Sequence, residues 1–332
     1  MRAAMVEGKR KVVIRDVPVP VLDKDEVLVK VQYCGVCGSD LHRYREGARL
    51  GIGHEFSGDI VEIGSDVKGW KVGDRVAVEP HRFCGECAWC RRGDEIGLCE
   101  KFYGWIEQYE GAFRTYAKVK YYQVYKLPDE LSYEHAAMIE PTTVALHAVR
   151  LSEMKEGDVV AVLGLGPIGQ LVARVARALG AKSVYATEAT PSRLELARDV
   201  VDEAIDINVI NPVDRILELT DGVGPDIVFE CAGTVSAAQQ SIALVRKGGT
   251  IIALSICFDW VEIPFSNIVL KGLTLKGFVC WTPGEYASAL NLIKDKRIAV
   301  APLLMCKMQL DDISEAFEQA SRGEGGTILI KP

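Results

Sequence analysis

The sequence contains no long hydrophobic run, no excess of positive charge and no repeated or low-complexity segment. None of its apolar stretches reaches the roughly 18 residues that a membrane-spanning helix needs. Aspartate and glutamate, 46 in all, outnumber the 39 lysines and arginines, and the net charge is −7. Nucleic acids and anionic membranes attract basic surfaces, so we expect neither as a partner. A small-molecule substrate suits this composition better.

The N-terminal segment also lacks the apolar core of a secretory signal peptide. We therefore expect a cytoplasmic protein, in which the ten cysteines serve as metal ligands or buried thiols rather than in disulfides. At 332 residues the chain is longer than one hydrophobic core usually supports, so two domains are expected.

The pattern of apolar residues changes near residue 133. Before it, short β-branched runs at 26–32, 58–64 and 74–78 are separated by glycine, which predicts antiparallel strands. After it, helical stretches alternate with almost continuously apolar strands at 159–163, 183–187, 227–230 and 250–254. Such strands are typical of a parallel sheet covered by helices on both faces, so the predicted fold class is α/β.

Four cysteines form a C-x2-C-x2-C-x8-C run: Cys84, Cys87, Cys90 and Cys99. Zinc takes four thiolate ligands at about 2.3 Å and imposes no electronic geometry of its own. The spacing therefore predicts a closed, structural zinc site.

A glycine-rich turn follows the predicted strand at 159–163 and opens a helix; it contains Gly164, Gly166, Pro167, Ile168 and Gly169. In this context the glycines indicate a dinucleotide site whose pyrophosphate lies at the helix N-terminus, although a tight turn without a ligand is the alternative. Glu188 ends the next strand and would accept hydrogen bonds from the ribose hydroxyls while repelling a 2′-phosphate, which favours NAD over NADP. Arg193 could stack on the adenine, pair with a phosphate or simply be solvated.

A second set of potential metal ligands is scattered along the chain: Cys37, His54, Glu55 and Glu140. One thiolate, one imidazole and one or two carboxylates are typical of an open catalytic zinc site. Spacing alone leaves other interpretations, because Cys34-x-x-Cys37 could be a redox pair and His54 an ordinary core histidine.

These segments together resemble the zinc-dependent medium-chain dehydrogenase/reductase family, from residue 2 to the C-terminus. The resemblance rests on the Cys-Gly-Val-Cys-Gly-Ser-Asp-Leu-His segment at 34–42, on Gly-His-Glu-Phe-Ser-Gly at 53–58, on the cysteine run, on Ile-Glu-Pro-Thr-Thr-Val-Ala-Leu-His-Ala at 139–148 and on the glycine-rich turn. The polyol branch, with sorbitol, 2,3-butanediol and threonine dehydrogenases, is the most similar. The family implies a GroES-like β domain at 1–145, completed by 290–332, and a doubly wound Rossmann NAD-binding domain at 146–289.

The resemblance also implies roles for individual residues. Cys37 and His54 match ligands of a catalytic zinc, Glu55 matches a glutamate that binds the metal or lies just behind it, and Glu140 stands where simple alcohol dehydrogenases hold a cysteine. Ser39 matches the hydroxyl that receives the substrate proton.

Further matches concern the proton path, the cofactor and the assembly. His42 matches the end of the proton relay at the solvent. Two segments match those that touch the nicotinamide end of NAD: Leu254, Ser255 and Ile256, and then Phe278, Val279 and Cys280. The resemblance implies three cofactors: NAD, one catalytic zinc and one structural zinc. It also implies a small alcohol or ketone as the substrate and assembly into a homodimer or homotetramer.

Several departures from the family pattern bear on the substrate. The loop between Cys90 and Cys99 is one residue longer than usual, and Cys280 replaces an arginine of sorbitol dehydrogenases, which argues against sorbitol. Arginines near the expected entrance could favour an anionic or highly hydroxylated substrate or be solvated: Arg43, Arg45 and Arg49. Three aromatic residues could line the pocket or belong to the core: Trp105, Tyr109 and Trp281.

The sequence therefore predicts an NAD- and zinc-dependent dehydrogenase of a vicinal diol or polyol. An L-threonine 3-dehydrogenase is the alternative within the same family. Two other classes are a zinc-free reductase of enones or quinones and a non-catalytic NAD-binding relative, but none of the matched ligands or relay residues is missing here.

Overall fold

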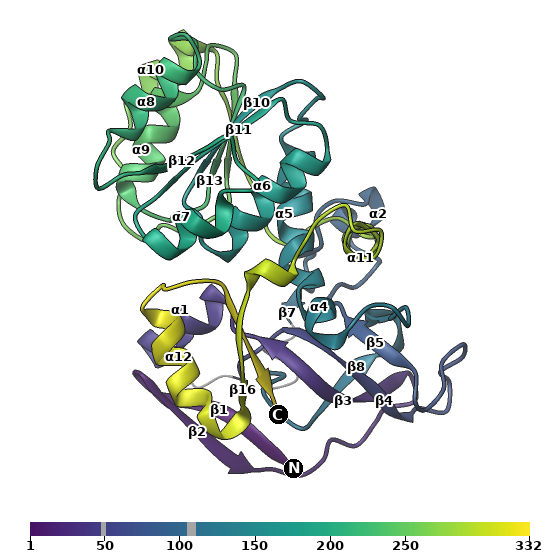
Figure 1. The fold of residues 1–332 in the computed structure, drawn as a ribbon. Helices are drawn as coiled ribbons and strands as arrows, with labels where there is room; N and C mark the ends of the chain where they lie inside the picture. Colours follow the sequence, from purple (N-terminus) through teal and green to yellow (C-terminus); the bar gives the residue numbers. More distant parts are fainter. Residues whose placement is uncertain (48–50, 105–110) are drawn as a thin grey trace.

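Two large β-sheets organise the computed structural model, which describes residues 1–47, 51–104 and 111–332 (Figure 1). One sheet is built from the middle of the chain, and the other combines strands from both of its ends.

The middle of the chain forms a six-stranded parallel sheet in the order β12-β11-β10-β13-β14-β15. Its strands are β10 (Val159–Leu163), β11 (Ser183–Glu188), β12 (Glu203–Asp206), β13 (Ile227–Glu230), β14 (Thr250–Ala253) and β15 (Thr274–Gly277). The order reverses between β10 and β13, and open α/β sheets bind ligands at the carboxyl ends of the strands at such a point.

Helices cover both faces of this sheet, which explains why its central strands are apolar throughout. Figure 1 shows α8, α9 and α10 on one side and α5 and α6 on the other. The helices of this part of the chain are α5 (Ile139–Leu151), α6 (Pro167–Ala178), α7 (Pro191–Ala197), α8 (Pro212–Leu219), α9 (Val235–Leu244), α10 (Phe265–Lys271) and α11 (Glu285–Lys294). The predicted α/β fold with a doubly wound parallel sheet is confirmed.

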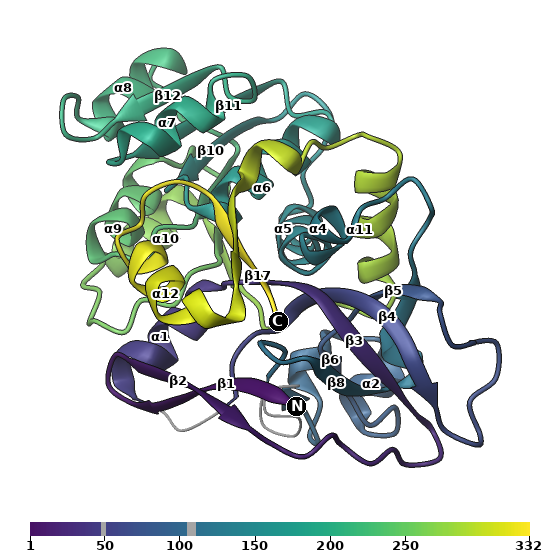
Figure 2. The ribbon, with the colours of Figure 1, turned by 60° about the horizontal axis from the view of Figure 1, so that its bottom comes forward.

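The second sheet has the order β16-β17-β3-β4-β5-β9, and β8 also pairs with β3. Its strands are β3 (Glu26–Gly35), β4 (Glu55–Ile63), β5 (Arg75–Val78), β8 (Tyr116–Lys120), β9 (Val124–Lys126), β16 (Leu304–Gln309) and β17 (Thr327–Lys331). Apart from β16 with β17, these pairs are antiparallel. The C-terminal β17 lies beside β3, where Leu329 is opposite Gly35 (Figure 2).

Short elements surround this sheet and carry several candidate ligands. Two strand pairs flank it, β1 (Arg2–Gly8) with β2 (Lys11–Asp16) and β6 (His81–Arg82) with β7 (Tyr103–Gly104). The helices are α1 (Gly38–Glu46), α2 (Ala88–Arg92), α4 (Tyr133–Ala137) and α12 (Ile313–Ser321), with 3-10 turns η1 (Ile96–Leu98), η2 (Tyr121–Gln123), η3 (Ala301–Leu303) and η4 (Leu310–Asp312).

Each sheet has its own apolar core. Fully buried side chains such as Phe56 and Phe317 fill the core of the antiparallel sheet, and Val162 and Phe229 lie within the parallel one. None of the helices in the described ranges is both long and apolar enough to cross a membrane.

Candidate active site and cofactor pocket

The four cysteines of the C-x2-C-x2-C-x8-C run converge at one point. Their sulfur atoms lie within 4.8 Å of one another, with 3.9 Å between Cys84 and Cys90 and 3.5 Å between Cys87 and Cys90. A tetrahedral Zn–S₄ centre with bonds of about 2.3 Å has sulfurs about 3.8 Å apart, so these residues fit zinc. Cys99 lies at the end of η1 and accepts the backbone N–H of Cys84 at 3.3 Å.

Backbone amides favour the thiolate forms of Cys84 and Cys87, whereas burial raises the pKa of Cys90. The N–H groups of Glu86 and Cys87 donate to the sulfur of Cys84 at 3.4 and 3.3 Å. Backbone N–H groups of Cys90 and Glu100 lower the pKa of Cys87 to about 6. Since a zinc ligand must be the thiolate, this local geometry suits metal binding.

A second group of metal-ligating atoms comes from two separate segments. Cys37 is the N-cap of α1, whereas His54 and Glu55 lie at the start of β4, and their ligand atoms are within 4.8 Å of one another. Pairing of β3 with β4 brings the two segments together, because Gly35 is opposite Glu55. A side chain at Gly35 would collide with the Glu55 carboxylate, since its Cβ would lie 2.3 Å from Oε2.

Asp40, which is fully buried, holds the two segments in place. Its Oδ1 accepts the N–H of Gly53 at 2.9 Å, and its Oδ2 accepts the N–H of Cys37 at 3.2 Å. Oδ1 also lies 3.7 Å from Nδ1 of His54. The two backbone hydrogen bonds therefore hold Cys37 and the segment before His54 close together, with the Asp40 carboxylate beside the imidazole.

Burial disfavours the charged forms of the acidic groups here. It raises the pKa of Glu55 to about 7 and that of Glu140 to about 8, and it also raises the pKa of Cys37. Glu140 lies in the first turn of α5 and is 5% exposed, but it is not among the three residues whose ligand atoms lie within 4.8 Å. A bound cation would offset this desolvation, so the donor set fits a divalent metal ion.

Ser39 and His42 are three residues apart on α1 and therefore lie on the same face of that helix. Ser39 is exposed, and the side chain of His42 is 40% exposed. The His42 ring stacks on Phe258 with 4.4 Å between centroids, and its Nε2 lies 3.4 Å from Oε2 of Glu46. Cys34, in contrast, is fully buried, and burial raises its thiol pKa well above the usual range.

The glycine-rich turn joins β10 to α6, as its sequence predicts. Gly164 has φ +95°, and a Cβ there would lie 2.9 Å from Ala232; a Cβ on Gly169 would lie 1.9 Å from the Gly164 carbonyl oxygen. Gly166 is different, because the nearest atom to its Cβ position is Nη1 of Arg193 at 3.8 Å. Pro167 and Ile168 open α6, whose N-terminus has no side-chain cap and leaves backbone N–H groups for an anion.

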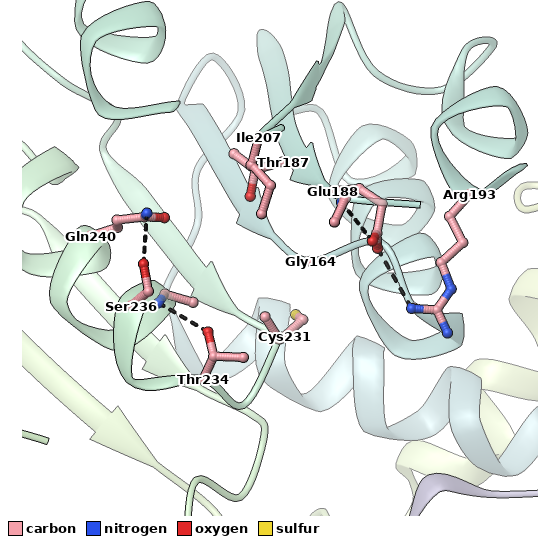
Figure 3. Close-up of a pocket in the computed structure, with 13 residues that line it drawn as sticks. Gly164, Thr187, Glu188, Arg193, Ile207, Cys231, Thr234, Ser236 and Gln240 are labelled. Carbon is pink, nitrogen blue, oxygen red and sulfur yellow. Dashed lines mark hydrogen bonds and ion pairs between the residues drawn. The ribbon is translucent and has the colours of Figure 1, made fainter. Parts of the chain in front are cut away.

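A cavity of about 260 Å³ adjoins this turn and is lined by Glu188 and Arg193 (Figure 3). The two Glu188 carboxylate oxygens accept backbone N–H groups of Leu165 at 2.9 Å, Ala189 at 2.8 Å and Thr190 at 3.0 Å. These bonds fix the carboxylate at the end of β11 and leave one lone pair, on Oε2, for a hydroxyl donor.

Arg193 lies beside Glu188, with Nη1 3.7 Å from Oε2, and the two side chains meet at one side of the cavity in Figure 3. Its Nε is buried and has no hydrogen-bond partner in the described part of the chain. An orphaned buried donor beside Gly166 and the start of α6 fits a phosphate-bearing ligand.

The two segments assigned to the nicotinamide end follow β14 and β15. The backbone N–H of Leu254 donates to the Glu230 carbonyl at 3.0 Å, and the Ser255 hydroxyl donates to the Glu230 carboxylate at 2.8 Å, whereas Ile256 is 73% exposed. Phe278, Val279 and Cys280 come directly after β15, and Cys280 has a φ of +64°.

Some residues expected from the sequence have a different setting or cannot be placed. Trp281 is fully buried and donates its indole N–H to Glu79 at 2.6 Å, so it belongs to the core rather than to an open pocket wall. Arg49, Trp105 and Tyr109 lie outside the described residues.

Sequence reasoning missed Glu230, a buried acidic residue at the carboxyl end of β13. Its Oε1 accepts the N–H groups of Ala232 and Gly233 at 2.9 and 2.8 Å, and Oε2 accepts from Ser255. The signal that could have found it is its place at the end of a central parallel strand, at the edge where such sheets bind ligands.

Comparison with known proteins agrees with this architecture. The family model for the alcohol dehydrogenase GroES-like domain matches residues 23–129, and the model for zinc-binding dehydrogenases matches residues 167–295. The chain belongs to the zinc-binding alcohol dehydrogenase family. The resemblance inferred from the motifs is thereby confirmed, the antiparallel sheet is the family's GroES-like domain, and the protein is an enzyme of the dehydrogenase class.

Relatives within the alcohol dehydrogenase family act on diols and polyols according to their names. A sorbitol dehydrogenase of Bacillus subtilis is 38% identical over 334 residues, which cover 96% of this chain and 93% of the relative. The crystal structure of 2R,3R-butanediol dehydrogenase from Bacillus subtilis matches with a TM-score of 0.90 at 34% identity, covering 100% of this chain and 99% of the other.

A further solved structure of this alcohol dehydrogenase family contains a cofactor. It is a zinc-binding dehydrogenase from Sinorhizobium meliloti bound to NADP, with a TM-score of 0.93 and 30% identity over 100% of this chain and 99% of the other. These names favour a diol or polyol enzyme over the threonine alternative, and membership of a zinc-binding family disfavours the zinc-free reductase.

Proposed function

We propose that this protein is a zinc- and NAD-dependent dehydrogenase that interconverts a vicinal diol or polyol and the corresponding ketone. The observation that carries the proposal is the convergence of Cys37, His54 and Glu55 within 4.8 Å of one another in a chain that also has a dinucleotide turn. The sorbitol and butanediol dehydrogenases among its relatives support the substrate class.

Cys37, His54 and Glu55 would hold the catalytic zinc. Glu140 is a further buried carboxylate that interacts electrostatically with His54 and Glu55. When bound, the metal supplies Lewis-acid chemistry that makes an alcohol more acidic, and NAD supplies the hydride acceptor. Carboxylates are harder ligands than thiolates, so Glu55 and Glu140 could exchange with water at the metal. Asp40 would keep the Cys37 and His54 segments in register.

Ser39 would receive the proton of the substrate hydroxyl, and His42 would pass it toward the solvent. Their positions one turn apart on α1 and their exposure support this path. Oε2 of Glu46 lies 3.4 Å from Nε2 of His42, at the solvent end of this path.

The cofactor would lie across the carboxyl ends of β10 and β13. Gly166 and the start of α6 would contact the pyrophosphate, with Arg193 beside it. Glu188 would accept hydrogen bonds from the ribose hydroxyls. A 2′-phosphate would meet the Glu188 carboxylate, so NAD is preferred over NADP. Leu254, Ser255 and Ile256, together with Phe278, Val279 and Cys280, would surround the nicotinamide.

Cys84, Cys87, Cys90 and Cys99 would hold the structural zinc, because all four sulfurs lie within 4.8 Å of one another and two of the pairs have the spacing of a tetrahedral centre. The ten cysteines are all unpaired in the structure, which supports a reducing, cytoplasmic location.

A homodimer or homotetramer would form through the edge of the parallel sheet. β15 is the edge strand, and Phe265, Val269, Leu270 and Leu275 on it and on the neighbouring α10 are each more than half exposed, at 71, 68, 78 and 51%. Edge strands with exposed apolar side chains are suited to pairing with a second copy.

The substrate assignment is tested by following NADH formation over a panel of linear diols, cyclic and linear polyols, sugar acids and L-threonine. A preference for one diol or polyol is expected, with the Ser39→Ala variant inactive but still loaded with zinc. Turnover of L-threonine equal to that of the best diol would reject the ranking, and no turnover of any compound would reject the proposed function.

A further inference from the structure

The loop between the third and fourth cysteines of the structural zinc cage reaches the segment after β15. The N–H of Ile96 donates to the Trp281 carbonyl at 2.8 Å, and the N–H of Val279 donates to Oε2 of Glu95 at 3.0 Å. Contact is close at Gly97 as well, because a Cβ there would lie 2.3 Å from Cγ1 and 2.5 Å from the carbonyl oxygen of Val279. Residues 95–97 and 279–281 therefore fit together closely.

The Glu95 carboxylate itself lies beside a buried histidine. Its side chain is 16% exposed, and Oε1 lies 3.5 Å from Nε2 of His147. The other ring nitrogen of His147 lies 2.7 Å from Oε2 of Glu285, and the edge of the imidazole meets the ring of Phe278 with 4.8 Å between centroids. Glu95 and Phe278 are thus fixed against the same buried histidine.

The segment that Glu95 contacts has a backbone that needs support. Cys280 has a φ of +64°, a backbone conformation that a residue with a side chain rarely keeps unless its surroundings hold it. The Glu95 carboxylate and the Ile96 N–H bond the residues on either side of Cys280, at Val279 and Trp281. Residues 95 and 96, in the loop between Cys90 and Cys99, therefore hold the strained backbone on both sides of Cys280.

We propose that Glu95 is a positioning residue for the nicotinamide end of the cofactor, so that the structural zinc cage sets the geometry of the active site as well as stabilising its own loop. The proposal rests on the proposed function for the placement of the nicotinamide beside 278–280. It gives the 94–98 loop a role in cofactor binding.

The test compares binding of NADH with binding of ADP-ribose, which lacks the nicotinamide ring. Glu95→Ala should weaken NADH binding and raise the KM for NAD roughly 10-fold, the effect of losing one hydrogen bond to a charged group. Binding of ADP-ribose should be unchanged. Glu95→Gln keeps an oxygen that can accept from Val279 and should restore most of the NADH affinity. Glu86→Ala, at an exposed carboxylate of the same cysteine cage, is the matched control.

Zinc content is measured for each variant, so that loss of the cage is recognised. Equal loss of NADH and ADP-ribose affinity in Glu95→Ala, or NADH binding no weaker than in Glu86→Ala, would overturn the proposal. If Glu95→Ala does not fold, Gly97→Ala is measured instead, because its Cβ must displace Val279; normal NADH binding by that variant would overturn the proposal. Since both ligands bind without substrate, an inactive wild-type protein would reject the proposed function while leaving this comparison readable.

Discussion

Replacing Asp40 with asparagine should weaken the catalytic metal site while changing only one atom of the side chain. In the native protein one oxygen of the Asp40 carboxylate accepts a hydrogen bond from the backbone N–H of Gly53, and the other accepts one from the backbone N–H of Cys37. The Asp40 side chain is fully buried. An asparagine offers one oxygen and one NH₂ group, so it can accept only one of these N–H groups and must direct a donor at the other.

The expected losses of stability and of zinc affinity follow from this unpaired N–H group and from the missing charge. A buried N–H without an acceptor costs about 1–3 kcal/mol, which should appear as a lower free energy of unfolding. Loss of the carboxylate near His54 should also lower zinc affinity by roughly 10–100-fold, as is usual for residues that orient a metal ligand.

The assay is zinc retention per chain after dialysis against increasing chelator, with diol turnover measured on the same samples. Asp66→Asn is the control, because Asp66 is exposed and belongs to neither group of metal ligands. The Asp40→Asn protein should lose one zinc and its activity at chelator concentrations that leave the control intact. If it kept both zinc ions as tightly as Asp66→Asn does, the assigned role of Asp40 would be wrong.

Three further predictions concern the cofactor pocket and the pH dependence of stability. Glu188→Ser removes the acceptor for the ribose hydroxyls and the charge facing a 2′-phosphate, so the ratio of kcat/KM for NAD to that for NADP should fall roughly 10-fold or more; an unchanged ratio would contradict the assignment. Gly169→Ala places a Cβ 1.9 Å from the Gly164 carbonyl oxygen and should lower the Tm measured by calorimetry. Gly166→Ala should keep the Tm and lose NADH affinity, which a fluorescence titration measures. Burial alone would raise the pKa of Glu285, but hydrogen bonds from His147 and the Thr282 backbone lower it to about 2. The stabilisation is therefore present above the unfolded pKa of about 4.3 and is lost as the pH falls toward 2, so Glu285→Gln should cost about 1–3 kcal/mol at pH 7 and progressively less below pH 4 in denaturant titrations.

Local sequence patterns predicted the parts of the fold that depend on neighbouring residues. The apolar run at 159–163, the glycines after it and Glu188 lie on two neighbouring strands and on the turn and helix start between them, so their spacing carried enough information. The convergence of the four cysteines could be predicted for the same reason, because they lie within 16 residues of the sequence.

The spacing of residues in the sequence could not predict contacts between distant segments. Cys37 and His54 could be joined only through resemblance to a family, since it is the β3–β4 pairing that brings them together. Glu95 gave no signal, because its partner Val279 is 184 positions away. Trp281 could equally have been a pocket residue or a core residue, and only its full burial and its bond to Glu79 decide for the core.

Zinc content and diol turnover of the Cys37→Ser variant, measured beside the wild-type protein, test the central claim most directly. We expect two zinc ions per chain and turnover of a diol with NAD for the wild type, and one zinc ion, a folded protein and no turnover for the variant. A Cys37→Ser protein that oxidised the diol at the wild-type rate would contradict the assignment of this site as the catalytic centre.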